Sequence, residues 1–171
     1  MNEKPSNQSS YEALYRIAEQ QAGYFATLQA KEAGYSQRQL TYYVRTGRFE
    51  RIRQGIYRLS QYPSEPNEDL FLAWLEAGRN AVISHESALA LYQLSDVLPA
   101  RVHLIIPPKA SRRHPGLQLH VNRLSAGEVT KYAGLPVTTV PRTIVDVAAS
   151  GLAEELVVQA VQEAIERGLT T

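Results

Sequence analysis

The segment that most constrains this chain of 171 residues covers positions 23–59. Its first half has the spacing of two short helices separated by a tight turn. Thr27 can cap a first helix, and Gly34 ends it, because glycine accepts the backbone angles that follow a helix. Ser36 can cap a second helix, since Gln39 follows it at the spacing of a capping box.

The second predicted helix has two unlike faces. Leu40, Tyr43 and Val44 recur at helical spacing and predict a face that packs on a core. The other face carries long polar and charged side chains, so it is free to enter the major groove of DNA. Arginine can bond the edge of guanine in bidentate fashion, which suits this face to reading bases. The candidates for base reading are Arg38, Thr41, Tyr42 and Arg45.

A hairpin follows the second helix. Gly47 breaks the helix, and residues 49–53 and 56–59 read as strands around Gln54-Gly55, a two-residue turn with a favoured glycine. Residues 11–22 have the pattern of a further helix that precedes the pair. Three helices followed by a basic hairpin predict a winged helix-turn-helix domain.

The two-residue turn sets the expected pairing of the hairpin. It places Arg51 opposite Arg58 and Ile52 opposite Tyr57. Alternation along the strands then directs Ile52 and Tyr57 inward and the arginines outward. Arginines that face each other repel, and a polyanion beside the hairpin relieves that repulsion. The candidates for contacts with DNA phosphates or the minor groove are Arg51, Arg53 and Arg58, with Gln37 at the start of the second helix and Arg48 after it.

Basic charge is concentrated in this part of the chain. The whole sequence carries 18 lysines and arginines against 17 acidic residues, which makes it nearly neutral. Residues 23–59 hold seven basic and two acidic residues, a net charge of +5, so the remainder carries −4. A local basic patch on an otherwise acidic chain is typical of a protein that binds phosphate backbones.

The length allows two small domains, and a segment rich in proline and serine marks the boundary. We expect a disordered lead over residues 1–10, the winged domain over 11–60, a linker over 61–67 and a mixed α/β domain over 68–171. The expected fold class of the whole chain is α+β. In the last domain, hydrophobic patterns predict strands over 81–83, 102–106, 117–121 and 135–138, and helices over 68–77, 84–92, 142–149 and 154–167.

The second domain offers little that indicates catalysis. His85, Glu86 and Ser87 are adjacent, but their spacing fits the start of a capped helix better than an active site. The four histidines are scattered and cysteine is absent, so we expect no metal site. The sequence has no glycine-rich phosphate loop, and we expect no cofactor and no enzymatic activity. Arg142 and Asp146 lie four residues apart on one predicted helix and are expected to form an ion pair.

A second small basic cluster follows a double proline. It consists of Lys109, Arg112 and Arg113. The cluster could extend a nucleic-acid contact, meet another partner, or simply be a solvated loop.

Nothing in the sequence indicates export or a membrane. The N-terminus lacks an apolar signal core, and no apolar run approaches the roughly 20 residues that span a bilayer. We therefore expect a cytoplasmic protein without a membrane partner.

Several segments, taken in order, resemble a known family. The winged segment reads SQRQLTYYVRTGRFERIRQGIYRL, and AVISHESALALYQL, VHLIIPP and GLPVTTVPRTIVDVA follow it. This order is similar to that of AbiEi-family antitoxins, which are predicted transcriptional regulators of abortive-infection systems. The resemblance covers nearly the whole chain.

The resemblance implies a role that the residues alone do not give. The protein would be the antitoxin of a type IV toxin–antitoxin pair. Its winged domain would repress its own operon by binding inverted repeats in the double-stranded DNA of the promoter. Its second domain would counter a nucleotidyltransferase-like toxin without forming a stable complex with it.

Two other functions stay open. Some relatives continue into a nuclease-like domain, so the chain could be the N-terminal part of a longer nucleic-acid-targeting enzyme that extends beyond Thr171. Alternatively, the second domain could bind a protein partner while the winged domain only localises it.

Overall fold

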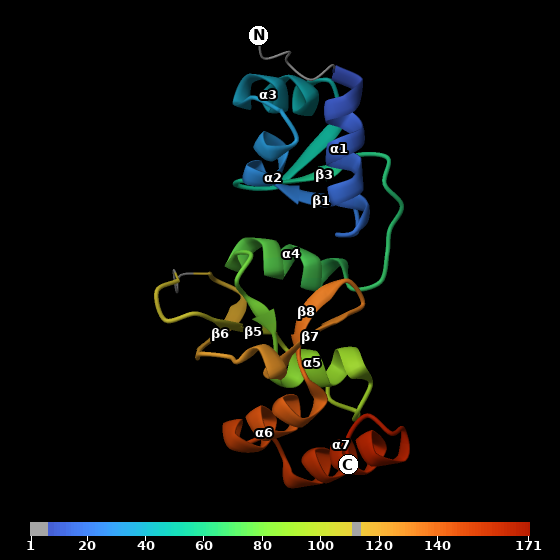
Figure 1. The fold of residues 1–171 in the computed structure, drawn as a ribbon, viewed down its shortest axis with the longest axis vertical. Helices are drawn as coiled ribbons and strands as arrows, with labels where there is room; N and C mark the ends of the chain where they lie inside the picture. Colours follow the sequence, from blue (N-terminus) through green and yellow to red (C-terminus); the bar gives the residue numbers. More distant parts are fainter. Residues whose placement is uncertain (1–6, 111–113) are drawn as a thin grey trace. The chain divides into compact units, whose positions relative to one another are not determined.

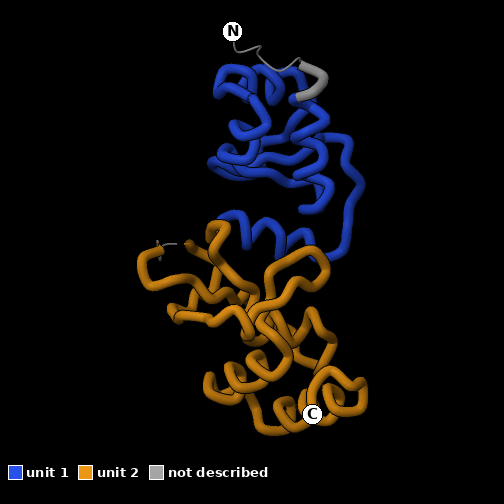
Figure 2. Tube along the Cα trace, in the orientation of Figure 1, with its two compact units in different colours: residues 1–76 blue, residues 77–171 orange. Residues whose placement is uncertain are grey.

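The computed structural model describes residues 7–110 and 114–171, and the chain divides into two compact units. The first unit ends at Glu76 and the second begins at Ala77 (Figure 2). We expected the boundary within the segment 61–67. The division falls at the last residue of the next helix, whose acidic side chains Glu68 and Glu76 bond to the sheet of the first unit. The combination of helices and two sheets confirms the α+β class.

The first unit builds its helices around a small antiparallel sheet with strand order β1-β3-β2 (Figure 1). Helix α1 begins at Asn7, inside the stretch 1–10 that we expected to be a disordered lead. The helix-turn-helix and both strands of the hairpin lie where the sequence predicted them. In chain order the elements are α1 (Asn7–Glu19), β1 (Tyr24–Ala26), α2 (Thr27–Glu32), α3 (Gln37–Arg45), β2 (Phe49–Arg53), β3 (Ile56–Leu59) and α4 (Glu68–Ala77).

Strand β1 is an element that the sequence did not reveal. It has three residues, too few for an alternating pattern to be recognised. Its Phe25 lies opposite Tyr57 of β3, and the two rings stack with centroids 5.7 Å apart. The strand therefore makes β3 the central strand of the sheet.

An aromatic core joins the helices to this sheet. Phe25 and Phe49 are almost fully buried, and their rings meet edge to face with centroids 5.1 Å apart. Tyr43 of α3 lies 5.3 Å from Phe49, measured between ring centroids. Leu14 of α1 and Leu40 of α3 belong to the same core and are fully buried. Burying a side chain of this size contributes about 1.5–3 kcal/mol to folding.

Local hydrogen bonds fix both helices of the helix-turn-helix. The Ser36 hydroxyl accepts from the Gln39 amide at 3.2 Å, and the Gln39 side chain accepts from the Ser36 amide at 2.9 Å, which confirms the predicted capping box. The prediction for Thr27 is wrong, since α2 begins at Thr27 and Ala26 is the cap residue. The amide and hydroxyl of Thr27 instead donate to the Gly55 carbonyl, at 2.9 and 3.2 Å. These bonds tie α2 to the hairpin turn.

The hairpin has its predicted strands but not its predicted register. A β-bulge at Ile52 inserts an extra residue into β2. Arg51 therefore lies opposite Tyr57, and Arg58 lies opposite Glu50. The repulsion that we expected between two facing arginines is absent, and Arg58 is half-buried rather than directed outward.

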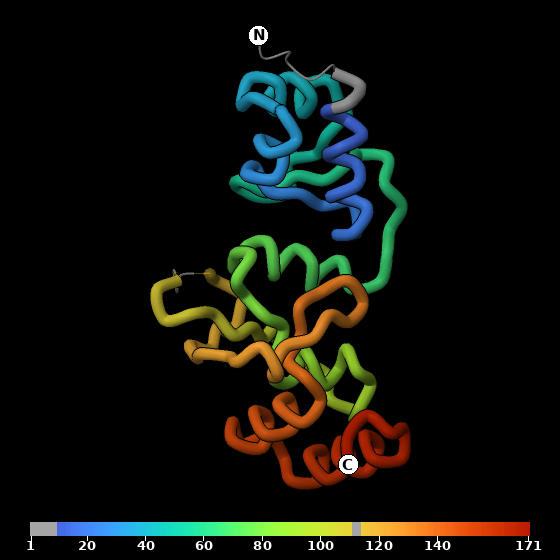
Figure 3. The backbone as a smooth tube through the Cα atoms, in the orientation of Figure 1, coloured from blue at the N-terminus to red at the C-terminus, as the bar shows by residue number. Residues whose placement is uncertain are grey.

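The second unit is built on a mixed sheet with strand order β6-β5-β4-β8-β7. Strands β5 and β6 run parallel, as do β4 and β8, while β7 and β8 form an antiparallel hairpin. Helix α5 contacts β5 and α6, and α6 contacts α7; Figure 3 shows the chain passing from β8 into these last two helices. The elements are β4 (Val82–Ile83), α5 (His85–Tyr92), β5 (Val102–Ile106), β6 (Leu117–Val121), the 3₁₀ turn η1 (Ala126–Glu128), β7 (Val129–Tyr132), β8 (Leu135–Thr138), α6 (Val140–Ser150) and α7 (Glu154–Glu166).

One strand of this unit differs from the sequence prediction. Strand β7 was not foreseen, because its turn to β8 is Ala133-Gly134 rather than a common turn pair such as Asn-Gly. Ile165 follows Val161 and Val158 at helical spacing on α7, and it is 54% exposed near the end of the helix. Among the described helices, none is long and apolar enough to cross a membrane.

Gly23 provides a test of the packing in the first unit. Its φ is 84°, and a Cβ there would lie 2.6 Å from Cγ of the Tyr62 ring. Gly23→Ala should therefore cost more than the roughly 1–3 kcal/mol of backbone strain alone. Urea unfolding followed by the fluorescence of Trp74, the single tryptophan, measures the loss.

Gly47→Ala is the matched control for this substitution. Gly47 has a φ of 76° but open space where a Cβ would be, so it incurs strain without a clash. Equal losses of stability in the two variants would contradict the role given to the Tyr62 ring.

Candidate nucleic-acid interface

Helix α3 has one buried and one exposed face, as the sequence predicted. Leu40 is fully buried and Tyr43 is 8% exposed, so the inner face holds the helix on the core. Tyr42, which directly precedes Tyr43 in the sequence, is 51% exposed. The outer face is exposed along its length and carries Arg38, Thr41, Tyr42 and Arg45.

Two contacts shape what this face offers to a ligand. The Thr41 hydroxyl donates to the Gln37 carbonyl at 3.0 Å, which leaves the Thr41 oxygen as an acceptor. The guanidinium of Arg45 lies 5.8 Å from the ring centroid of Tyr42, a cation–π contact that keeps the two side chains together. Gln37 itself is exposed in the first turn, where free backbone amides favour anions.

Arg48 extends the basic surface beyond the end of α3. Its guanidinium carbon lies 4.2 Å from the ring centroid of Tyr11 and 5.4 Å from that of Tyr43. The side chain is exposed, so two aromatic rings position a positive charge that solvent can reach.

The three arginines of the hairpin have different environments. Arg51 is exposed and forms no ion pair with another described residue. Arg53 donates through Nη1 to both carboxylate oxygens of Glu76, at 3.1 and 3.0 Å. Arg58 places Nη2 3.0 Å from the Glu68 carboxylate. Carboxylates of α4 therefore hold two of the three side chains that we expected to contact phosphates.

Glu68 fastens the start of α4 to the central strand. Its Oε1 accepts from the Glu65 amide at 3.0 Å and from the Ser64 hydroxyl at 3.1 Å, besides Arg58. These donors, the amide first, hold the pKa of Glu68 below its ordinary value. Arg58 also donates to the Pro63 carbonyl at 3.1 Å, so both partners are bound on several sides.

The second basic cluster is described only in part. Lys109 is exposed in the turn after β5. Arg112 and Arg113 lie outside the described residues, so the contact proposed for this cluster stays a prediction.

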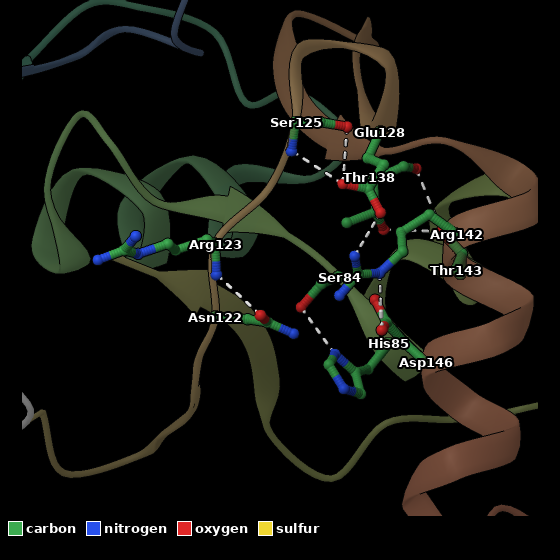
Figure 4. Close-up of polar contacts among 10 residues, drawn as sticks. All are labelled: Ser84, His85, Asn122, Arg123, Ser125, Glu128, Thr138, Arg142, Thr143 and Asp146. Carbon is green, nitrogen blue, oxygen red and sulfur yellow. Dashed lines mark hydrogen bonds and ion pairs between the residues drawn. The ribbon is translucent and has the colours of Figure 1, made fainter. Parts of the chain in front are cut away.

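Three histidines that are far apart in sequence come together in the second unit. The rings of His85 and His120 stack with centroids 3.5 Å apart and 9° between their planes. Nδ1 of His103 lies 3.2 Å from Nε2 of His120, so one ring donates to the other. His85 also places Nδ1 2.9 Å from the Ser84 hydroxyl (Figure 4). No spacing or motif in the sequence indicated this convergence.

The stacked rings are not arranged as a metal centre. Parallel rings direct their nitrogen lone pairs into separate planes, so His85 and His120 do not aim at one ion. The described residues contain no group of three or more His, Cys, Asp or Glu that could hold a metal. Burial lowers the pKa of all three histidines, and that of His85 falls to about 3, with the charges of His120, His103 and Arg142 adding to the effect. The cluster is therefore neutral near pH 7.

An ionic network lies near the His85 ring (Figure 4). Nε of Arg142 lies 2.9 Å from Oδ1 of Asp146, which confirms the predicted pair along α6. Arg142 also bonds to Glu128, whose pKa falls to about 2 because the Ser125 amide and the guanidinium both donate to it. Oδ2 of Asp146 is buried without a hydrogen-bond partner among the described residues. The network joins α6 to the turn before β7 and has the features of a structural contact.

The histidine cluster predicts that acid destabilises the second unit. An unfolded histidine binds a proton near pH 6.5, whereas folded His85 resists protonation down to about pH 3. Stability is therefore full above pH 6.5 and falls as the pH drops through this window, by about 2 kcal/mol at pH 5 for His85 alone. Thermal unfolding followed by circular dichroism between pH 7.5 and 5 measures the loss.

Two variants assign the pH dependence to the cluster. His85→Asn should flatten the dependence of stability on pH, whatever it costs at pH 7.5. His114→Gln alters a histidine outside the cluster and should keep the full dependence. The opposite pattern would show that the acid sensitivity arises elsewhere.

The comparisons with known proteins concern mainly the first unit. Residues 12–60 match a family model described as "Transcriptional regulator, AbiEi antitoxin". No curated protein matches the chain. Among solved structures, the crystal structure of the RV2827C protein from Mycobacterium tuberculosis is similar, with 16% sequence identity and a TM-score of 0.47 over 85% of this chain and 62% of that one. This chain thus spans less than two thirds of that protein's chain.

The family match coincides with the structural unit that carries the basic face. Its 12–60 span includes most of α1, the helix-turn-helix and the whole hairpin. The resemblance stated from the sequence is confirmed over these residues. The first domain of the chain is thus similar to the AbiEi antitoxin family of transcriptional regulators.

Proposed function

We propose that this protein is a DNA-binding autorepressor that recognises the promoter of its own operon through α3. The observation that carries the proposal is the exposed basic face of α3, set opposite a fully buried face in a domain of a regulator family. Base edges would be read by Arg38, Thr41, Tyr42 and Arg45, and phosphates would be held by Gln37, Arg48 and Arg51.

The spacing of Arg38 and Arg45 along α3 predicts the distance between the base pairs that they would contact. Arg38 and Arg45 are separated by seven residues, which is about 10 Å along a helix axis. Base pairs stack about 3.4 Å apart, so the two guanidinium groups would meet positions about three base pairs apart. Thr41 and Tyr42 lie between the two arginines and would face the base pairs between those two positions. A methyl or ring contact to thymine suits their side chains.

The charge distribution supports DNA rather than a general anion. The protein is nearly neutral overall, and residues 23–59 carry a net charge of +5. Inverted repeats would fit two copies of such a domain, each reading one half-site in a major groove.

Binding to a labelled fragment of the upstream region, with random DNA as competitor, tests the repressor role. Arg38→Ala combined with Arg45→Ala should abolish the preference for the promoter, because a good bidentate contact supplies about 1–3 kcal/mol of discrimination. The matched control replaces Arg16 on α1 and Arg123 in the second unit, which removes the same charge from exposed positions outside α3. Loss of preference in the control, or its survival in the α3 variant, would overturn the assignment of the reading face.

We further propose that the chain is an antitoxin that counters a nucleotidyltransferase-like toxin without a stable complex. The family of its first domain supports this role, and so does the separation of the chain into two compact units. In this proposal the chain is cytoplasmic and has no catalytic activity of its own, and its second unit carries the neutralising function.

One observation favours a protein contact as the alternative. Apolar side chains on the last two helices are exposed, among them Val145 at 62% and Ile165 at 54%. Such residues are common at protein interfaces, although single exposed apolar side chains also occur on ordinary surfaces.

Co-expression with the neighbouring toxin gene from an unrelated promoter separates the two activities. The Arg38→Ala/Arg45→Ala variant should still protect cells, because its second unit is unchanged. Failure of this variant to protect would show that neutralisation needs DNA binding. Stable co-purification with the toxin would support the protein-contact alternative instead.

A further inference from the structure

The ion pair between Arg53 and Glu76 links the tip of the hairpin to the end of α4, within the first unit. Arg53 is the last residue of β2 and directly precedes the turn. One nitrogen of its guanidinium donates to both Glu76 oxygens, at 3.1 and 3.0 Å. This carboxylate therefore occupies Arg53 much as an anionic oxygen of a phosphate group would.

The Arg53–Glu76 pair is more exposed than the Arg58–Glu68 pair, and its arginine has fewer described partners. The Arg58 side chain is 13% exposed, and it contacts Glu68, the Pro63 carbonyl and the ring of Tyr24. The Arg53 side chain is 51% exposed and has Glu76 as its described partner. The Arg58–Glu68 pair is part of the domain's structure, while the Arg53–Glu76 pair is a surface contact that solvent and ions can reach.

A surface pair of this kind is weak enough to be exchanged. Exposed ion pairs change an equilibrium by a factor of about 1.5 to 5, since water and salt screen them. A DNA phosphate releases counterions when a cation binds it, so DNA can compete for the same guanidinium. Arg51 lies two residues away on the same strand and is exposed, and the bulge at Ile52 places it on the face of Tyr57 while Arg53 lies on the face of Ile56. DNA that contacts Arg51 at this edge of the sheet would therefore reach Arg53 only when its side chain leaves Glu76.

We propose that Glu76 is an intramolecular competitor of DNA for Arg53, and that it holds this arginine back from the phosphate backbone. The inference rests on the proposed DNA-binding function and adds a restraint to it. Arg53 contributes to binding only when Glu76 releases it, whereas Arg51 and Arg48 are available at all times. Any event that neutralises or moves the end of α4 would then strengthen binding without changing which bases are read.

Promoter binding by the full chain tests the restraint through a double-substitution cycle. Glu76→Gln keeps the shape of the side chain and removes its charge, so it should tighten binding about 1.5- to fivefold. It should also make the slope of log K against log salt steeper by about 0.9, the value for one added phosphate contact. Arg53→Ala should cancel the gain when it is combined with Glu76→Gln.

Asp69→Asn is the control for charge alone. Asp69 is exposed on the same helix and has no arginine partner among the described residues, so its substitution removes one acid without freeing a guanidinium. An equal gain from Asp69→Asn, or a gain from Glu76→Gln that persists in the Arg53→Ala background, would overturn the restraint. No effect of Glu76→Gln on a natural chain that binds its promoter would overturn it as well. Absence of promoter binding by the natural chain would instead refute the proposed function.

Discussion

The aromatic contact between α3 and the hairpin determines which side chains of α3 face outward. The ring of Tyr43 packs between Tyr35 and Phe49, at centroid distances of 5.8 and 5.3 Å. With Leu40 fully buried beside them, these rings allow α3 one rotation about its axis. Rotating the helix by a single residue would expose Tyr43 and bury a charged neighbour. Both changes would destabilise the folded state, because the interior is close-packed and a buried charge loses its hydration. The reading face is therefore set by apolar packing, not by attraction among charges.

The three arginines of the hairpin differ in their position in the sheet and in their partners. Arg58 is on the central strand, between Tyr24 of β1 and Glu50 of β2, where a charge without a close partner would be costly. Glu68 supplies that partner, which explains why α4 groups with the first unit. Arg51 lies on the outer strand and has no ion-pair partner among the described residues, and Arg53 at the turn is held by Glu76 while its own side chain stays 51% exposed. One basic stretch of sequence thus yields a structural cation, an available cation and a restrained one.

Local features of the sequence were sufficient to predict the elements of the first unit. The capping box of α3 involves residues three apart, and the hairpin turn involves two adjacent ones, so short-range chemistry specifies both. The register of the hairpin could not be obtained in this way, because a bulge at Ile52 depends on how the strands pack on the core. The partner of Arg58 was also out of reach, since it lies across the segment 61–67 on the next helix.

The histidine cluster of the second unit could not be predicted from local sequence patterns either. His103 lies opposite Gln118 across parallel strands, so His120 is its diagonal neighbour on the same face of the sheet. Alternation gives the face of each residue, but it cannot tell which strands pair in parallel or in what register. His85 reaches these rings from α5, and the sequence holds no spacing that relates the three.

The two units therefore differ in where their titratable and charged groups lie. The first keeps cations at its surface, where salt weakens them and a carboxylate can hold one back. The second keeps imidazole rings neutral in its interior, where acid rather than salt disturbs them. A change in promoter binding with salt at neutral pH therefore reports on exposed cations such as those of the first unit. A change that appears only below about pH 6.5 reports on the second. The two responses can therefore be measured separately on a single chain.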